Sequence, residues 1–128
     1  MLTNAKIVAT VATGDIRRAS DFYSGTLGLP SMSATDDVLA YLLPDGSSLT
    51  VYQRANHRPP ENTTVTFLVP DLEAEVAELR GRGVAFEDYD MPGLKTVDGI
   101  ASQPDGFKAA WFKDPDGNIL SIGSLPRS

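Results

Sequence analysis

The segment VATGDI at residues 11–16 is the most informative for the fold, because its character recurs as LVPDL at residues 68–72. In each copy an aspartate, Asp15 or Asp71, follows an alternating run of β-forming residues and precedes an apolar stripe at helical spacing. Each aspartate is therefore predicted to be a helix N-cap, whose carboxylate accepts amide hydrogens of the first turn. The sequence predicts the same strand-to-helix transition twice.

A second repeated signal is a predicted hairpin turn, Pro44-Asp45-Gly46 in the first half and Pro115-Asp116-Gly117 in the second. The turns are 71 residues apart and the helix starts are 56 apart, so the second half carries 71 − 56 = 15 extra residues. The excess lies in the segment from Met91 to Gly106, which is long for a connection without structure of its own. We expect this segment to form a lid or a dimer-contact loop.

Each half is predicted to contain a strand, a helix and three further strands. The fold class is α+β, with two βαβββ modules packed as one domain over residues 1–128. Module one covers 1–53, a linker covers 54–62 and module two covers 63–128. The predicted elements are 6–13, the helix 15–26, 30–34, 37–43 and 48–53, then 63–69, the helix 71–82, 84–89, 107–113 and 118–122.

Composition narrows the range of partners. The 128 residues are 41% hydrophobic and contain no cysteine, which removes thiol nucleophiles and thiolate zinc sites. The net charge of −6 repels phosphate backbones and anionic lipids, so we expect neither a nucleic-acid nor a membrane partner. The longest N-terminal apolar run, residues 7–12, is too short for a signal sequence or a membrane span, which favours a cytoplasmic protein.

Alternation along the strands predicts one apolar face for the helices and one mixed face for a polar-lined cavity. The assignment depends on the turns, because an odd-residue turn would exchange the two faces of the strands it connects. With even-residue hairpins, Trp111 belongs to the core. The mixed face then holds Leu39, Tyr41, Thr50 and Tyr52 in module one, and Lys108, Ala110, Phe112, Ile119 and Ser121 in module two.

Three motifs extend this reading: Phe22-Tyr23 followed by Leu27-Gly28-Leu29, Val69-Pro70-Asp71, and above all FKDPDGN at 112–118. With the repeated βαβββ plan, they make the chain resemble the vicinal oxygen chelate superfamily of glyoxalases, bleomycin resistance proteins and extradiol dioxygenases. The resemblance covers essentially the whole chain. It implies a homodimer and a U-shaped cavity built from eight strands of a mixed sheet.

The resemblance also bears on metal binding. Metal-dependent members of the superfamily hold a divalent ion through His, Gln or Glu at four strand positions, which correspond here to Val8, Thr50, Thr64 and Ser121. A hydroxyl beside an aliphatic side chain cannot replace imidazole nitrogen or carboxylate oxygen as a ligand. We therefore expect no metal and no other cofactor, which puts the metal-dependent reactions of the superfamily in doubt.

Other polar residues have structural explanations. His57, the only histidine, falls in the linker, where a solvated loop position is the simpler interpretation. The run Glu87, Asp88 and Asp90 is typical of a solvated strand end, or of a surface that meets a cationic ligand. Lys108 is the one cation predicted on the mixed face.

The favoured hypothesis is a metal-free protein that sequesters a hydrophobic or aromatic, and in some cases cationic, small molecule such as an antibiotic. Two alternatives stay open: a metal-independent lyase or isomerase that uses Tyr41 or Tyr52 with a nearby carboxylate, and a glyoxalase-like metalloenzyme with its metal elsewhere. No catalytic residue is assigned. The predicted ligand-binding residues are Thr10, Tyr41, Thr50, Tyr52, Thr64, Thr66, Met91, Leu94, Lys108, Phe112 and Ser121.

Overall fold

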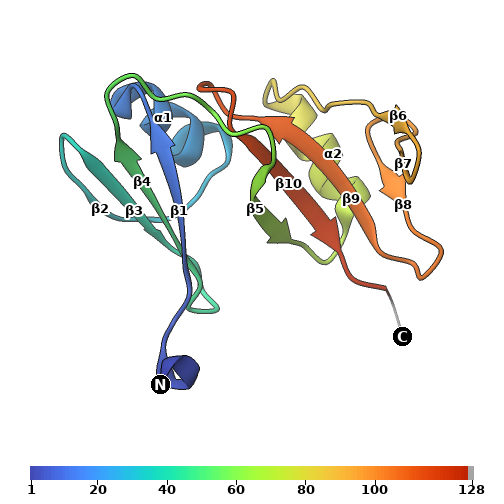
Figure 1. Ribbon diagram of the computed structural model, residues 1–128, viewed down its shortest axis with the longest axis horizontal. Coiled ribbons are helices and arrows are strands. Elements are labelled where there is room, and N and C mark those ends of the chain that lie inside the picture. The colour runs from blue at the N-terminus through green and yellow to red at the C-terminus, as the bar shows by residue number, and fades with distance from the viewer. Residues whose placement is uncertain (127–128) are drawn as a thin grey trace. The chain divides into compact units, whose positions relative to one another are not determined.

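The computed structural model describes residues 1–126, and the chain forms two compact units, Met1–Pro59 and a second that begins at Pro60. Each unit contains a four-stranded mixed sheet with a helix on one face (Figure 1). The predicted α+β class with two βαβββ modules is confirmed at this level. Within the described residues, no helix has both the length and the apolar character needed to cross a membrane.

Unit one begins with a single 3-10 turn, Leu2–Asn4, and β1 (Val8–Thr13). Helix α1 (Ile16–Ser20) follows and continues as a π-helical segment, Asp21–Thr26. The remaining strands are β2 (Ser31–Ala34), β3 (Val38–Leu42) and β4 (Ser48–Gln53). The sheet order is β1-β4-β3-β2, and β1 runs parallel to β4.

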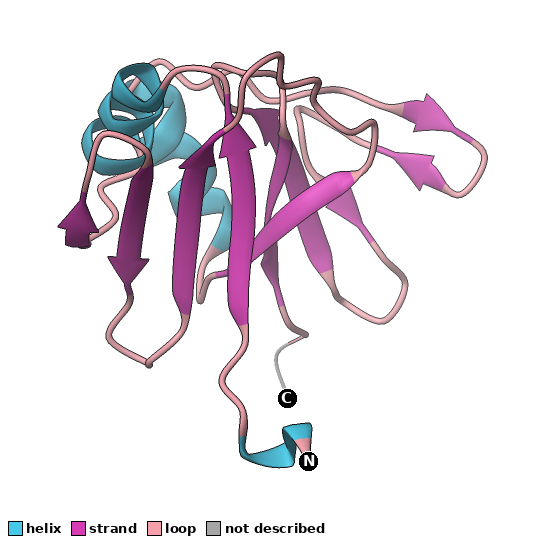
Figure 2. Ribbon diagram, turned by 60° about the vertical axis from the view of Figure 1, so that its left-hand side comes forward, coloured by secondary structure: helices cyan, strands magenta, loops and turns pink. Residues whose placement is uncertain are grey.

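Unit two repeats this topology (Figure 2). Its elements are β5 (Thr63–Leu68), α2 (Leu72–Gly81), β8 (Ala101–Ser102), β9 (Lys108–Lys113) and β10 (Ile119–Ser124). The order is β5-β10-β9-β8, and β5 runs parallel to β10. A separate hairpin of β6 (Asp90–Met91) and β7 (Leu94–Lys95) lies between α2 and β8 in the chain.

Both predicted helix caps are confirmed. The Asp15 carboxylate accepts hydrogen bonds from the amides of Arg17 at 3.1 Å and Arg18 at 3.2 Å. The Asp71 carboxylate accepts one from Ala74 at 3.1 Å. These bonds satisfy amides that have no partner inside the helix, so each helix starts directly after its aspartate.

The two hairpin turns have an odd number of residues, which makes the predicted face assignment wrong. Leu42 pairs with Ser48 across residues 43–47, and Lys113 pairs with Ile119 across residues 114–118. Directly paired residues point to the same side of a sheet. The five-residue loops therefore move one strand of each hairpin by one residue relative to the expected register.

The corrected register places two large aromatic rings against the helices. Tyr41 pairs with Leu49 and is 1% exposed, and its ring lies 6.3 Å from that of Tyr23, which the π-helical segment carries. Phe112 pairs with Leu120 and is fully buried. Both rings belong to the core rather than to the mixed face.

The predicted strand over 84–89 is also wrong. Only Phe86 forms a bridge, to Phe112, and the Glu87 amide donates to the Trp111 carbonyl at 2.8 Å. Beyond this point the chain leaves β9, and β8 occupies the rest of the sheet edge by pairing Ala101 with Ala109. The predicted edge strand is thus replaced by two segments, the Phe86 bridge and β8, and β8 lies within the inserted residues.

Candidate ligand-binding faces

Each sheet has one face without a helix, and we call these open face one and open face two. Helix α1 and the π-helical segment cover the Tyr41 side of sheet one, and α2 covers the Lys108 side of sheet two. The opposite sides carry hydroxyl, apolar and aromatic groups. Open face one comprises Val8, Thr10, Ala12, Ser33, Val38, Ala40, Leu42, Ser48, Thr50 and Tyr52, and open face two comprises Thr64, Thr66, Leu68, Ala109, Trp111, Lys113, Ile119, Ser121 and Gly123.

Open face one presents exposed apolar groups beside hydroxyls. Val8 is 48% exposed, Leu42 46% and Tyr52 37%. Thr10 pairs with Thr50 on the neighbouring strand, and Thr50 pairs with Ala40. A row of small side chains therefore crosses the sheet between larger apolar ones.

Open face two has an equivalent row with different chemistry. Thr66 pairs with Ser121, and Ser121 pairs with Trp111. The Thr66 and Ser121 hydroxyls lie 2.7 Å apart and form one hydrogen bond. The Tyr89 ring packs edge-on against Trp111, with ring centroids 5.6 Å apart. This row thus runs from two hydroxyls to two aromatic rings.

The four positions that correspond to metal ligands do not fit a metal ion. Val8 and Thr50 lie on open face one, and Thr64 and Ser121 lie on open face two. Val8 has no donor atom, and the Thr64 hydroxyl donates to the Ile119 carbonyl at 3.0 Å. None of the four supplies the imidazole or carboxylate that a divalent transition metal requires. Across residues 1–126, no three His, Cys, Asp or Glu side chains cluster in an arrangement that could hold a metal.

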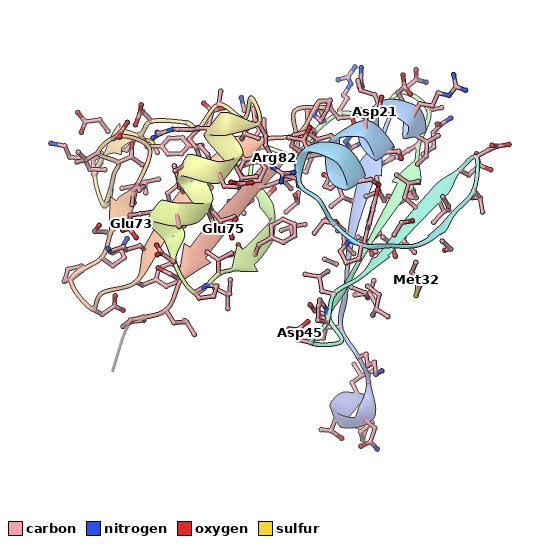
Figure 3. All side chains as sticks on the ribbon, turned by 180° about the vertical axis from the view of Figure 1, so that it is seen from behind. Asp21, Met32, Asp45, Glu73, Glu75 and Arg82 are labelled. Carbon is pink, nitrogen blue, oxygen red and sulfur yellow. The ribbon has the colours of Figure 1, made fainter. Side chains whose placement is uncertain are left out.

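Three predicted ligand-binding residues are corrected by the register. Tyr41 and Phe112 are in the core, and the Tyr41 hydroxyl lies 2.8 Å from that of Ser24. Lys108 faces α2, where its ammonium group pairs with the Glu73 carboxylate at 2.6 Å (Figure 3 shows Glu73 at the start of α2). The physical reason is the same for all three, because the odd-residue turns place them opposite the mixed face.

The other predicted residues stay on the predicted mixed faces or in the insertion, although Ser121 is only 3% exposed and the Thr64 hydroxyl is bonded to the Ile119 carbonyl. Thr10, Thr50 and Tyr52 lie on open face one, and Thr64, Thr66 and Ser121 on open face two. Met91 is 51% exposed in β6, and its partner Leu94 is half-buried in β7.

Sequence reasoning missed two aromatic residues of open face two, Trp111 and Tyr89. An even-residue turn predicts Trp111 in the core, whereas the five-residue turn places it on open face two. One signal could have corrected this: Asp114 and Asn118, at the two ends of the turn, can bond each other. The Asp114 carboxylate accepts from the Asn118 amide at 2.9 Å and from its side-chain Nδ2 at 2.8 Å, which closes a five-residue loop.

The inserted segment has structure of its own. The Asp88 carboxylate accepts hydrogen bonds from the Thr96 hydroxyl and from the Gly99 amide, both at 2.9 Å. Asp88 therefore fixes the insertion through one carboxylate oxygen, while its side chain stays exposed. Burial raises the pKa of the adjacent Tyr89 phenol, with a further contribution from the charge of Glu87, so Tyr89 is neutral at physiological pH.

A small hollow of about 130 Å³ lies at the start of α2, lined by Pro70, Asp71, Leu72, Glu73, Gly106, Lys108, Ser124 and Leu125. Its cation and the Glu73 carboxylate are already paired with each other. His57 is half-buried in the segment between β4 and β5. Neither feature places a reactive group on an open face.

Comparisons with known proteins agree with the fold. The family model of the Glyoxalase/Bleomycin resistance protein/Dioxygenase superfamily matches residues 6–122. A glyoxalase/bleomycin resistance protein from Catenulispora acidiphila DSM 44928 superposes with a TM-score of 0.72 at 24% identity, over 94% of this chain and 98% of that one. A member of the superfamily from Sphaerobacter thermophilus DSM 20745 gives 0.72 at 22% identity, over 98% and 100%.

A glyoxalase-related enzyme from Fulvimarina pelagi gives a TM-score of 0.68 at 18% identity, over 95% of this chain and 88% of that one. Identities this low establish that the chains share a fold, and they carry no information about a shared activity. No curated protein matches the chain.

Proposed function

The chain belongs to the glyoxalase/bleomycin resistance protein/dioxygenase superfamily, and from this premise we propose that it binds a small hydrophobic or aromatic molecule on its open sheet faces without a resident metal ion. In this proposal it sequesters its ligand, such as an antibiotic, as a cytoplasmic homodimer. No reaction is assigned to it.

One observation carries the proposal. The open faces combine hydroxyls with apolar groups, while the four strand positions that could chelate a metal hold one aliphatic and three hydroxyl side chains. Apolar surface of this kind is stabilised when a ligand covers it, and the hydroxyls can orient the ligand. A chelated metal would need donors that these positions lack.

Charge supports the choice of ligand. The net charge of −6 attracts a cationic compound over long range and repels an anionic one. Cationic aromatic antibiotics therefore suit both the charge and the faces.

A thermal-shift screen tests binding. The compounds are glycopeptides, anthracyclines and mitomycins, and a ligand at a hundredfold excess over its Kd adds about 2.7 kcal/mol to the free energy of unfolding. Thr10→Lys places a charge on open face one and should reduce the shift if the ligand lies there. Ser31→Lys is the matched control, because Ser31 is exposed on β2 but pairs with Tyr41 on the helix side.

Two results would overturn the proposal. The first is one stoichiometric transition metal ion per subunit, found by elemental analysis of protein purified without chelator. The second is the absence of any thermal shift across the screen. Steady-state product formation from a compound that binds would instead replace sequestration with catalysis.

A further inference from the structure

We propose that Tyr89 and Trp111 form the aromatic wall of a ligand site on open face two, and that Asp88 and Thr96 position this wall. The site would accept a flat aromatic compound that carries a hydrogen-bonding substituent. The inference rests on the proposed function and specifies where and how the ligand binds.

The geometry of the row points to this class of ligand. Thr66, Ser121 and Trp111 are direct partners on three adjacent strands, which are spaced about 4.8 Å apart. The row therefore places the exposed Thr66 hydroxyl within the length of a two- or three-ring compound from the indole of Trp111. Thr66 is exposed and its hydroxyl can make a further hydrogen bond, whereas Ser121 is 3% exposed and holds Thr66 through the bond that joins them.

The aromatic rings are accessible as well as ordered. Trp111 and Tyr89 are both half-buried, and their rings meet edge-on at an angle of 84°, so neither ring is stacked on the other. Flat ligands stack on such rings, and the neutral Tyr89 phenol adds a polar group at the ring edge. The Glu87 carboxylate contributes to the raised Tyr89 pKa and pairs with the Lys113 ammonium group at 3.8 Å, so the attraction for a cationic ligand comes from the net charge of the chain.

The position of Tyr89 depends on the insertion. The Tyr89 amide donates to the Thr96 hydroxyl at 2.8 Å, and the Thr96 amide donates to the Tyr89 carbonyl at 2.8 Å. The Thr96 hydroxyl in turn donates to Asp88. Thr96 is only 8% exposed, so these bonds are shielded from water. Both the amide and the carbonyl group of Tyr89 are thus held by Thr96.

A second set of contacts holds the insertion against α2 and Phe86. The Arg80 side chain of α2 donates to the Asp98 carbonyl at 2.8 Å and lies over the Phe86 ring. Gly99 has a φ of +81°, and a Cβ there would lie 2.9 Å from Arg80 and 3.1 Å from Phe86. Only glycine allows this close approach with this backbone. The insertion is therefore a packed support for Tyr89 rather than a free loop.

Trp111 makes the inference directly measurable, because it is the only tryptophan of the chain. The probe is proflavine, a flat cationic tricyclic compound, and the readouts are Trp111 emission excited at 295 nm and calorimetric Kd. Binding at the wall should quench Trp111. Tyr89→Ala should raise Kd about tenfold, the order expected when a stacked ring is removed.

Conservative variants separate positioning from folding. Tyr89→Phe keeps the ring and should bind within about twofold of the unmodified chain, because the stacking surface is retained. Thr96→Val removes the hydroxyl at nearly constant volume and should weaken binding about threefold through Tyr89. Thr35→Val is its matched control, since Thr35 also accepts turn amides through its hydroxyl but lies in unit one.

The outcomes are distinct. If the chain binds proflavine without quenching Trp111, and Tyr89→Ala binds as tightly, the aromatic wall is wrong while the proposed function stands. If the chain binds other compounds of the screen but not proflavine, the ligand class is wrong. If it binds nothing at all, the proposed function fails and this inference fails with it.

Discussion

The two units have one topology but differ at equivalent positions of the open faces. Thr10 and Thr66 occupy the same place before the helix cap, and Thr50 and Ser121 the same place after the turn. On the third strand, however, unit one has Ala40 where unit two has Trp111. The two units therefore share hydroxyl side chains at two equivalent positions. At the third position, tryptophan in unit two in place of alanine in unit one provides an aromatic surface for stacking.

The sheet edges of the two units also differ, and again unit two carries the additional aromatic residue. In unit one the edge is a single strand, β2, from which Met32 projects with 59% exposure (Figure 3). In unit two the edge is divided between the Phe86 bridge and β8, and Tyr89 lies just before the insertion and is bonded to its Thr96. The extra residues of the second half thus hold the Tyr89 ring beside Trp111 without changing the sheet order.

The turns differ in how they are stabilised. Asp114 is 5% exposed and is bonded to the Asp116 and Asn118 amides and to the Asn118 side chain. Asp45 in unit one is exposed and bonds only locally, to Ser47. Substitutions at equivalent places should therefore have unequal effects, and the four predictions below run from the largest to the smallest.

The largest effect is expected at the core position that the two units share. Phe112→Ala should lower the free energy of unfolding by about 4 kcal/mol, because it removes a fully buried ring. Urea denaturation followed by Trp111 emission measures it. Phe112→Leu is the control. It keeps an apolar side chain in the site and should lower the free energy of unfolding by less than about 1.5 kcal/mol. A loss below about 1 kcal/mol for the alanine variant would mean that the ring is not in the core.

The second prediction tests the unequal turns. Asp114→Ala should cost about 3 kcal/mol, since it leaves buried amide donors without their acceptor. Asp45→Ala, at the exposed turn, serves as the comparison and should change the thermal midpoint far less. Equal shifts in the two midpoints would show that burial does not distinguish the turns.

A third, smaller effect concerns the hydroxyl that unit one has and unit two lacks at this core position. Tyr41→Phe should cost about 1 kcal/mol through loss of the bond to Ser24. A double-mutant cycle with Ser24→Ala measures the coupling, and the two changes together should cost less than their sum. Strict additivity would indicate that the two hydroxyls do not interact.

The smallest effect is a pH dependence at the exposed turn. Hydrogen bonds from Ser47 hold the pKa of the Asp45 carboxyl below its usual value. The ionised Asp45 carboxyl therefore stabilises the folded state at pH values above its unfolded-state pKa of about 3.9. This stabilisation is lost as the pH falls through the lower pKa of the folded state. Melting temperatures between pH 2.5 and 6 should show a slightly shallower acid decline for Asp45→Asn. A steeper decline in that variant would reverse the assigned sign.

Much of the fold could be predicted from local signals. The aspartate caps, the spacing of the two halves and the site of the insertion all depend on residues within one turn or strand of each other, and the structure agrees with them. The resemblance to the superfamily is confirmed by the match over residues 6–122. The predicted strand over 84–89 failed because Asp88 finds partners in Thr96 and Gly99, which local β propensity does not register.

For the candidate site, alternation alone determined that each sheet has two chemically different faces, since successive side chains of a strand point to opposite sides. It could not determine which residues of β3 and β9 share a face with their partners. That depends on the number of residues in each turn, and a change of one exchanges the faces. The positions of Tyr41 and Phe112 in the core and of Trp111 on the open face follow from the hydrogen-bond register between strands, which is a property of the folded sheet.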